Sequence, residues 1–283
     1  MTTALPRLPD VLGAESRPFT QTIDARWLMA YAGGLGEDDR HFYDTLEPGG
    51  PVAHPLFPVC YEWPPLVDLR ERAIGAEVAP RSVHATHDLA IGRMPRAGES
   101  VTSRARVIAI DARRAGTRLV ARLTTTGAGG EILTTTDYGS VYRGVEATKT
   151  GRLEPPLAPP PAASPAARGW SEPIDVRAEA AHVYTECARI WNPIHTDVAV
   201  ARAAGLPAII LHGTATLALA VSRVVRRELG GDPRRVRRIA ARFTGFVRLP
   251  SALTVRGRAG SSIAFDVVAA DGTPVLGEGI VSP

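Results

Sequence analysis

The sequence predicts an α+β protein made of two similar halves, each with a helical block followed by an antiparallel sheet. The chain has 283 residues, of which 45% are hydrophobic, and this is enough for two modest domains. A stretch rich in proline and alanine interrupts it between residues 154 and 169. On both sides of that stretch, segments of alternating polar and apolar residues are bounded by turn residues, which is typical of strands.

The clearest boundary is the segment that reads EPPLAPPPAASPAARG. Proline fixes the backbone angle φ and lacks an N–H donor, so neither a helix nor a central strand continues through such a run. We therefore expect a first domain at residues 1–150, a linker at residues 151–170 and a second domain at residues 171–283.

The two halves repeat a pattern in their helical blocks. The first half contains AYAGGLGEDDRHFYD and then GPVAHPLFPVCYEWPP, whereas the second contains VYTECARIWNPIHTD and then LPAIILHGTATLALA. Tyr31 and His41 are spaced almost as Tyr184 and His195 are. This similarity predicts an internal duplication.

The strands expected in the first half lie at residues 82–91, 99–111, 117–127 and 131–144. Those expected in the second half lie at residues 237–248, 251–260, 261–271 and 274–282, and Asp271-Gly272 is a hairpin signal. Residues 213–227 read GTATLALAVSRVVRR and predict a buried helix, because the first turns are small and apolar almost all round. A shorter helix should begin after Asp197, which suits an N-cap.

The segment from Tyr184 to Gly213 carries the chemistry. Asn192, Pro193 and His195 are expected in a turn after a helix, and His212-Gly213 opens the buried helix. An imidazole in a turn can move protons near neutral pH, and the free N–H groups of a helix start can hold a developing oxyanion. Together these groups suggest chemistry on an acyl carbonyl.

This pattern resembles the MaoC-like (R)-specific enoyl-thioester hydratases and dehydratases. Their signature has a tyrosine, then roughly S-G-D-x-N-P-x-H, and then a glycine-led apolar helix. Asn192, Pro193 and His195 match this signature, but Ile190 stands where the family has its catalytic aspartate. The resemblance implies a double hotdog, in which two helix-wrapped antiparallel sheets form a pseudo-dimer. It also implies that the N-terminal repeat is degenerate and mainly shapes the acyl pocket.

The resemblance implies roles for individual residues. His195 would transfer protons at the α and β carbons of the substrate, and the Gly213 N–H would bind the thioester oxygen. Glu186 precedes Ile190 by one helical turn and is a candidate substitute acid. Substrate contacts are expected from Asn192, Trp191, His212 and Tyr184.

Each of these residues also has a purely structural interpretation. His195 could be a buried capping residue, Gly213 a packing residue, Trp191 a core residue and Glu186 a solvated side chain. In the first half, Pro55 follows His54 where the other half has a glycine, and Pro58, Pro64 and Pro65 predict a broken helix. The first repeat is therefore expected to lack an oxyanion site.

Three functions remain open at this stage. The first is a hydratase or dehydratase acting on an enoyl or 3-hydroxyacyl thioester of coenzyme A or acyl carrier protein. The second is a biosynthetic isomerase or cyclase that uses the same pocket, and the third is a non-catalytic acyl-binding subunit. The replacement of the aspartate by Ile190 motivates the second and third, since isoleucine can neither donate nor accept a proton.

The composition also bears on the location of the protein and on the kinds of ligand that it binds. The chain has only two cysteines, Cys60 and Cys187, and no apolar run of signal-peptide or membrane-span type, so a cytoplasmic location is expected. No motif implies a metal or cofactor, and nucleic acid binding is not expected because no recognition motif accompanies the arginines. Seven arginines between Arg223 and Arg238 could contact phosphates of a carrier or form a solvated helix end. A homodimer through exposed sheet edges is possible.

Overall fold

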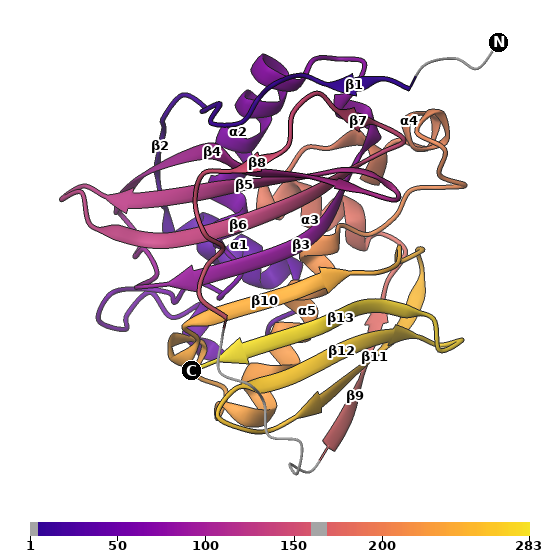
Figure 1. Cartoon of the computed structure of the whole chain (residues 1–283). Coiled ribbons are helices and arrows are strands. Elements are labelled where there is room, and N and C mark those ends of the chain that lie inside the picture. The colour runs from indigo at the N-terminus through magenta and orange to yellow at the C-terminus, as the bar shows by residue number, and fades with distance from the viewer. Residues whose placement is uncertain (1–4, 160–168) are drawn as a thin grey trace.

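The computed structural model of the protein describes residues 5–159 and 169–283. Within these ranges an 11-stranded sheet runs across the molecule (Figure 1). Its strands, in spatial order, are β2 (Phe19–Thr22), β4 (Ser100–Arg113), β5 (Gly116–Gly127), β6 (Ile132–Arg143), β3 (Ser82–Ile91), β10 (Arg238–Phe243), β13 (Pro274–Ser282), β12 (Ile263–Ala269), β11 (Ser251–Arg258) and β9 (Gly169–Val176), with β8 (Gly151–Arg152) beside β4. A separate parallel pair joins β1 (Arg7–Leu8) to β7 (Glu146–Ala147).

The two half sheets meet where β3 pairs antiparallel with β10. At this seam Arg238 of β10 holds Asp88 of β3 through two hydrogen bonds, from Nε to Oδ1 at 2.5 Å and from Nη2 to Oδ2 at 2.8 Å. Each half contributes its own meander and its own central helix. The predicted α+β class and double-hotdog arrangement are therefore confirmed.

The central helix of the second half is α5 (Gly213–Glu228), close to the predicted range 213–227. Its apolar face is buried in the core cluster that both halves share. Upstream, α4 (Val198–Ala203) begins as predicted at Asp197, whose side chain accepts hydrogen bonds from the N–H groups of Ala199 and Val200. The expected N-cap is confirmed.

The central helix of the first half is α2 (Pro58–Leu69), and it is unbroken, so the prediction that its prolines interrupt it is wrong. Pro58 occupies the first turn, where a missing N–H costs nothing. Pro65 leaves the carbonyl of Tyr61 without its helical donor, and Gln21 replaces that donor with a side-chain hydrogen bond of 2.9 Å to the Tyr61 carbonyl.

The two repeats also contact each other through their shorter helices. α1 (Ala25–Gly34) packs against α3 (Ala180–Ala188), and the hydroxyls of Tyr31 and Tyr184 lie 3.3 Å apart. These two tyrosines hold equivalent places in the duplicated pattern, so their contact marks the pseudo-symmetry between the halves. Single turns of other helix types are η1 (Arg40–Phe42), η2 (Arg70–Ile74), η3 (Ala79–Arg81), η4 (Pro193–His195) and η5 (Pro233–Arg235).

All eight predicted strands are present, with differences at their ends. β10 stops at Phe243, short of the predicted residue 248. The edge strands β2 and β9 were not predicted, and β9 begins at Gly169, inside the expected linker. Residues 160–168 of that linker lie outside the described ranges, so the three-part division of the chain stays a prediction. In the part of the chain that is described, no helix is long and apolar enough to cross a membrane.

Candidate active site

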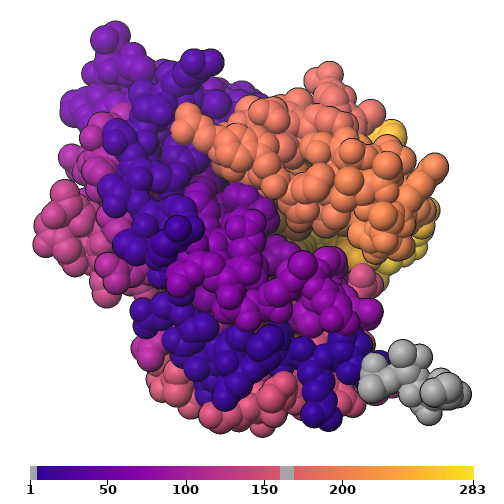
Figure 2. Space-filling view, turned by 90° about the horizontal axis from the view of Figure 1, so that it is seen from above, coloured from indigo at the N-terminus to yellow at the C-terminus, as the bar shows by residue number. Residues whose placement is uncertain are grey.

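A cavity of about 710 Å³ lies between the two halves. Its walls come from α2, β3 and β6 of the first half and from residues 190–195, the start of α5, β10 and β13 of the second. Seen from above, the orange segment of the second half lies directly against the indigo and purple first half (Figure 2). The volume is in the range of sites that enclose most of a small ligand.

His195 lies in η4, lines this cavity and is only 9% exposed. Its Nδ1 lies 2.8 Å from the carbonyl oxygen of Ile210. Because a carbonyl only accepts, Nδ1 must carry the proton, and Nε2 keeps a free lone pair. Burial lowers the pKa of His195 to about 4, so the ring is neutral at neutral pH. The ring is thus held in the tautomer that can accept a proton at Nε2.

His212 stacks on His195, with ring centroids 3.7 Å apart. Burial, and then the neighbouring His195, hold the pKa of His212 well below its usual range. Its Nε2 lies 3.3 Å from Thr185 Oγ1. The stack holds the His195 ring in place and disfavours a second positive charge beside it.

Gly213 is the first residue of α5 and also lines the cavity. N–H groups in the first turn of a helix have no carbonyl of that helix to bond. A Cβ at this position would lie 2.9 Å from Cε1 of Phe243, so only glycine fits without moving that ring. The helix start is therefore open to a ligand oxygen, and the helix dipole adds partial positive charge there.

The structure separates the other expected substrate contacts. Asn192 lines the main cavity, whereas Trp191 is 62% exposed and lines an adjoining hollow of about 330 Å³. Tyr184 lies behind the cavity wall, where its hydroxyl donates to Thr214 Oγ1 at 3.1 Å. His195, Gly213, His212 and Asn192 are brought together, and the first two face the same space.

Glu186 is exposed and is not among the residues of the cavity, so its expected role as substitute acid needs correction. Glu186 and Ile190 would share a face only on a helix that continues to Ile190. Instead α3 ends at Ala188, and Arg189 adopts a left-handed conformation with φ 57°. That turn directs Ile190 into the cavity and leaves Glu186 on the surface.

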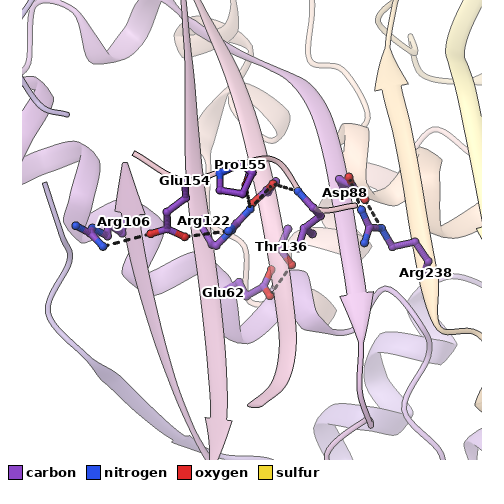
Figure 3. A network of polar contacts seen from close by, with 10 residues as sticks. Glu62, Asp88, Arg106, Arg122, Thr136, Glu154, Pro155 and Arg238 are labelled. Carbon is purple, nitrogen blue, oxygen red and sulfur yellow. Dashed lines mark hydrogen bonds and ion pairs between the residues drawn. The ribbon is translucent and has the colours of Figure 1, made fainter. Parts of the chain in front are cut away.

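The one carboxyl that lines the cavity, among the described residues, is Glu62 of α2. It is 3% exposed, and Thr136 of β6 donates a hydrogen bond of 2.8 Å to its Oε1 (Figure 3). Burial raises the pKa of Glu62 to about 8, so the side chain is protonated at neutral pH. Glu62 is not among the site residues predicted from the sequence. The sequence feature that could have indicated it is a single acidic residue inside the otherwise uncharged segment PVCYEWPPLV.

A smaller cleft of about 270 Å³ lies beside His54 of the first repeat, and its other wall comes from the end of α5 and residues 231–233 of the second half. Glu37 follows Tyr31 by the same interval as Ile190 follows Tyr184, and it lies 3.7 Å from His54 Nε2. Here α2 starts four residues after His54, not directly after it. A helix start is therefore missing beside this histidine, in agreement with the expected loss of an oxyanion site.

The arginine cluster lies at the other end of α5 and takes no part in lining the cavity. Arg226 pairs with Asp38, Arg234 with Asp232, and Arg238 with Asp88 at the sheet seam. These three arginines thus have carboxylate partners, and the cluster does not place a phosphate site beside His195.

The sequence was compared with protein-family models and with known proteins. Residues 165–270 match the model of the MaoC like domain. The peroxisomal enoyl-CoA hydratase 2 of Arabidopsis thaliana is 42% identical over 53 residues, which are 19% of this chain and 17% of that protein. A fatty acid synthase beta subunit of Emericella nidulans is 41% identical over 64 residues, or 23% of this chain and 3% of that protein. The chain thus spans a small part of either relative.

Solved structures resemble almost the whole chain. A MaoC-like dehydratase from Phytophthora capsici superposes with a TM-score of 0.81 at 22% identity, covering 98% of this chain and 97% of that one. The peroxisomal multifunctional enzyme type 2 of Drosophila melanogaster gives 0.75 at 21% identity, over 95% of this chain and 48% of that one. A Mycobacterium tuberculosis protein described as a double hotdog gives 0.63 at 16% identity, over 98% and 97%. The resemblance inferred from the N-P-x-H motif is confirmed: this chain carries a MaoC-like domain within a double-hotdog fold.

Proposed function

We propose that this protein is a hydro-lyase that hydrates an enoyl thioester or dehydrates a 3-hydroxyacyl thioester. The main support is the shared cavity of His195 and the start of α5. One offers a neutral base with a free Nε2, and the other offers N–H groups for an oxyanion. The MaoC like domain match and the short alignment with an enoyl-CoA hydratase 2 agree with this chemistry.

In the hydration direction, His195 Nε2 takes a proton from water as the water oxygen bonds to Cβ. The electron pair of the Cα=Cβ double bond moves to the thioester oxygen, where the Gly213 N–H stabilises the negative charge. The negative charge on the thioester oxygen then re-forms the carbonyl, and Cα takes a proton from the His195 imidazolium. Dehydration runs through the same steps in reverse.

One imidazole moves both protons in this scheme, which accounts for Ile190 at the position of the family's aspartate. A pKa of about 4 makes protonated His195 a strong acid, so it readily gives its proton to carbon. The same low pKa makes the neutral ring a weak base. We therefore expect slower turnover than a two-residue site would give.

The carrier enters through the adjoining hollow in our proposal. That hollow shares Trp63, Arg70, Asn192 and Pro193 with the main cavity, and Trp191 forms its outer wall. Aromatic and apolar walls suit the slender arm that joins a thioester to coenzyme A or to an acyl carrier protein. The location in the cell and a homodimer remain predictions.

Ile190 also favours a second candidate, an isomerase or cyclase. In that case His195 would move a proton between two carbons or promote ring closure of a similar carbonyl compound, and the product would have the formula of the substrate. A non-catalytic acyl-binding subunit is the third candidate, and it would bind ligand equally well after loss of His195.

The test is turnover of trans-2-enoyl and 3-hydroxyacyl thioesters on coenzyme A and on acyl carrier protein, over several chain lengths. His195→Ala should lower the rate by roughly 10² to 10⁴, the usual contribution of a positioned acid or base. His41→Ala is the matched control, because that histidine is the counterpart of His195 in the first repeat and does not line the cavity. Absence of any water addition or loss by the wild type, or equal rates in His195→Ala, would reject the proposal.

A further inference from the structure

We call the part of the cavity at His195 and Gly213 the reacting corner. One wall of the cavity beyond that corner carries polar side chains. We name it the distal polar wall, and its members are Glu62, His84, His87 and Tyr138. His87 of β3 stands directly opposite Tyr138 of β6, and the next inward pair along the strands is Leu89 opposite Thr136. Because Thr136 binds Glu62, the Glu62 carboxyl lies about one such pair from His87.

Phe243 separates this wall from the reacting corner. On one side its ring closes on Gly213, within 2.9 Å of where a Cβ would be. On the other side its ring centroid lies 4.4 Å from that of His84, which in turn stacks on Tyr138 at 3.7 Å. A chain whose thioester oxygen lies at Gly213 therefore passes one aromatic ring before it reaches the distal polar wall.

His87 has polar atoms without partners. It is 1% exposed, and neither ring nitrogen has a hydrogen-bond partner within residues 5–159 and 169–283. A buried polar group without a hydrogen bond costs free energy, and His87 faces a cavity that a ligand can fill. The neutral ring offers one donor and one acceptor.

Glu62 completes the wall in a neutral form. Its Oε1 accepts from Thr136, and as a protonated acid it has an O–H left to donate. His84 Nε2 lies 3.1 Å from the carbonyl of Thr86, so Nε2 is its donor and Nδ1 remains an acceptor. Burial lowers the pKa of His87 to about 4, and thus no member of the wall carries a charge at neutral pH. The wall thus offers neutral donors and acceptors that suit an oxygen group, and the charged side chains that line the same cavity are Arg70 and Arg143.

We propose that the distal polar wall recognises an acyl chain that carries a hydroxyl or keto oxygen beyond its reacting carbons. This inference rests on the proposed function, because it assumes that the thioester lies at Gly213. It deepens that function by assigning the substrate class: an oxygen-substituted acyl thioester, not a plain alkyl one. His87 and Glu62 are the specificity residues.

The test measures binding, so it does not depend on turnover. Saturated acyl-coenzyme A probes cannot be hydrated, and their Kd values are measured by calorimetry for a plain chain and for chains of equal length with one hydroxyl or one keto group at successive carbons beyond Cβ. The wild type should bind at least one oxygen-bearing probe roughly tenfold more tightly than the plain probe, as one or two neutral hydrogen bonds allow. The two probe series separate the hydroxyl from the keto group.

His87→Phe keeps a ring of similar size without nitrogens, and it should reduce this preference roughly fivefold. Glu62→Met should reduce it to a similar degree. Thermal melting checks that both variants fold, and either variant alone suffices for the test. The inference is overturned if the wild type prefers the plain chain at every position, or if the preference is the same in a folded variant. The proposed function fails separately, through absence of turnover with both kinds of substrate.

Discussion

Replacing Glu62 by glutamine should stabilise the protein at neutral pH and have little effect in mild acid. Glutamine has nearly the same shape and still accepts the hydrogen bond from Thr136, but it cannot ionise. In the unfolded chain Glu62 loses its proton near its ordinary pKa of 4.5, whereas burial raises the pKa in the folded protein to about 8. Between these values the folded state holds a proton that the unfolded state has released. Stability of the wild type therefore falls as pH rises through this window.

The magnitude follows from the width of the window. Each pH unit above 4.5 lowers the free energy of unfolding of the wild type by about 1.4 kcal/mol. The loss therefore reaches up to about 3 kcal/mol at pH 7, and it no longer grows above pH 8. For a chain of this size, each kcal/mol corresponds to roughly 2 to 4 °C in Tm. Glu62→Gln should thus raise Tm by several degrees at pH 7 and leave it nearly unchanged at pH 4.5.

The assay is thermal unfolding of wild type and variant from pH 4.5 to pH 8.5. Glu77→Gln is the control, because Glu77 is exposed to solvent. A Tm difference for Glu62→Gln that does not change with pH, or one that favours the wild type at pH 7, would show that Glu62 is ionised in the folded protein. The neutral character of the distal polar wall would then be wrong.

Further predictions concern the reacting corner and the seam of the sheet. Gly213→Ala should lower kcat/KM, because the new methyl displaces Phe243 and crowds the oxyanion position. Enzyme kinetics on protein shown by melting curves to be folded check this, and unchanged kinetics would contradict it. Arg238→Leu should lower the free energy of unfolding by roughly 1 to 3 kcal/mol in urea titrations, since Asp88 is left half-buried without its partner. The kcat/KM of the folded enzyme should fall as pH drops through about 4, where His195 gains a proton, and a fall already centred near pH 6.5 would mean that burial does not lower its pKa.

Much of the fold could be predicted from the sequence because its signals are local. The strands after each helical block alternate in polarity, and the start of α5 follows directly from His212-Gly213 and an apolar run. The continuity of α2 could not be predicted, since it depends on a hydrogen bond from Gln21, a residue far from Pro65 in sequence. Proline rules describe a helix alone, and here another segment supplies the missing donor.

In the candidate site, too, the residues of a local motif could be predicted, whereas those brought in by long-range packing could not. His195 and Gly213 belong to one motif with fixed spacing, so sequence alone indicated both. Glu62 comes from the other half, and only the packing of α2 against β6 brings it to the cavity. Of the two interpretations of Glu186, the solvated side chain agrees with its exposed position, and the left-handed turn at Arg189 that separates it from Ile190 has no simple sequence signal.

The most direct test of the central claim is the transfer of oxygen from labelled water. Wild-type protein and His195→Ala are incubated with a trans-2-enoyl thioester in water enriched in oxygen-18, and mass spectrometry measures the label at Cβ of the product. We predict label in the 3-hydroxyacyl product of the wild type and almost none with His195→Ala. Unlabelled product of the same formula as the substrate, or equal labelling by both proteins, would contradict hydration by His195 and Gly213.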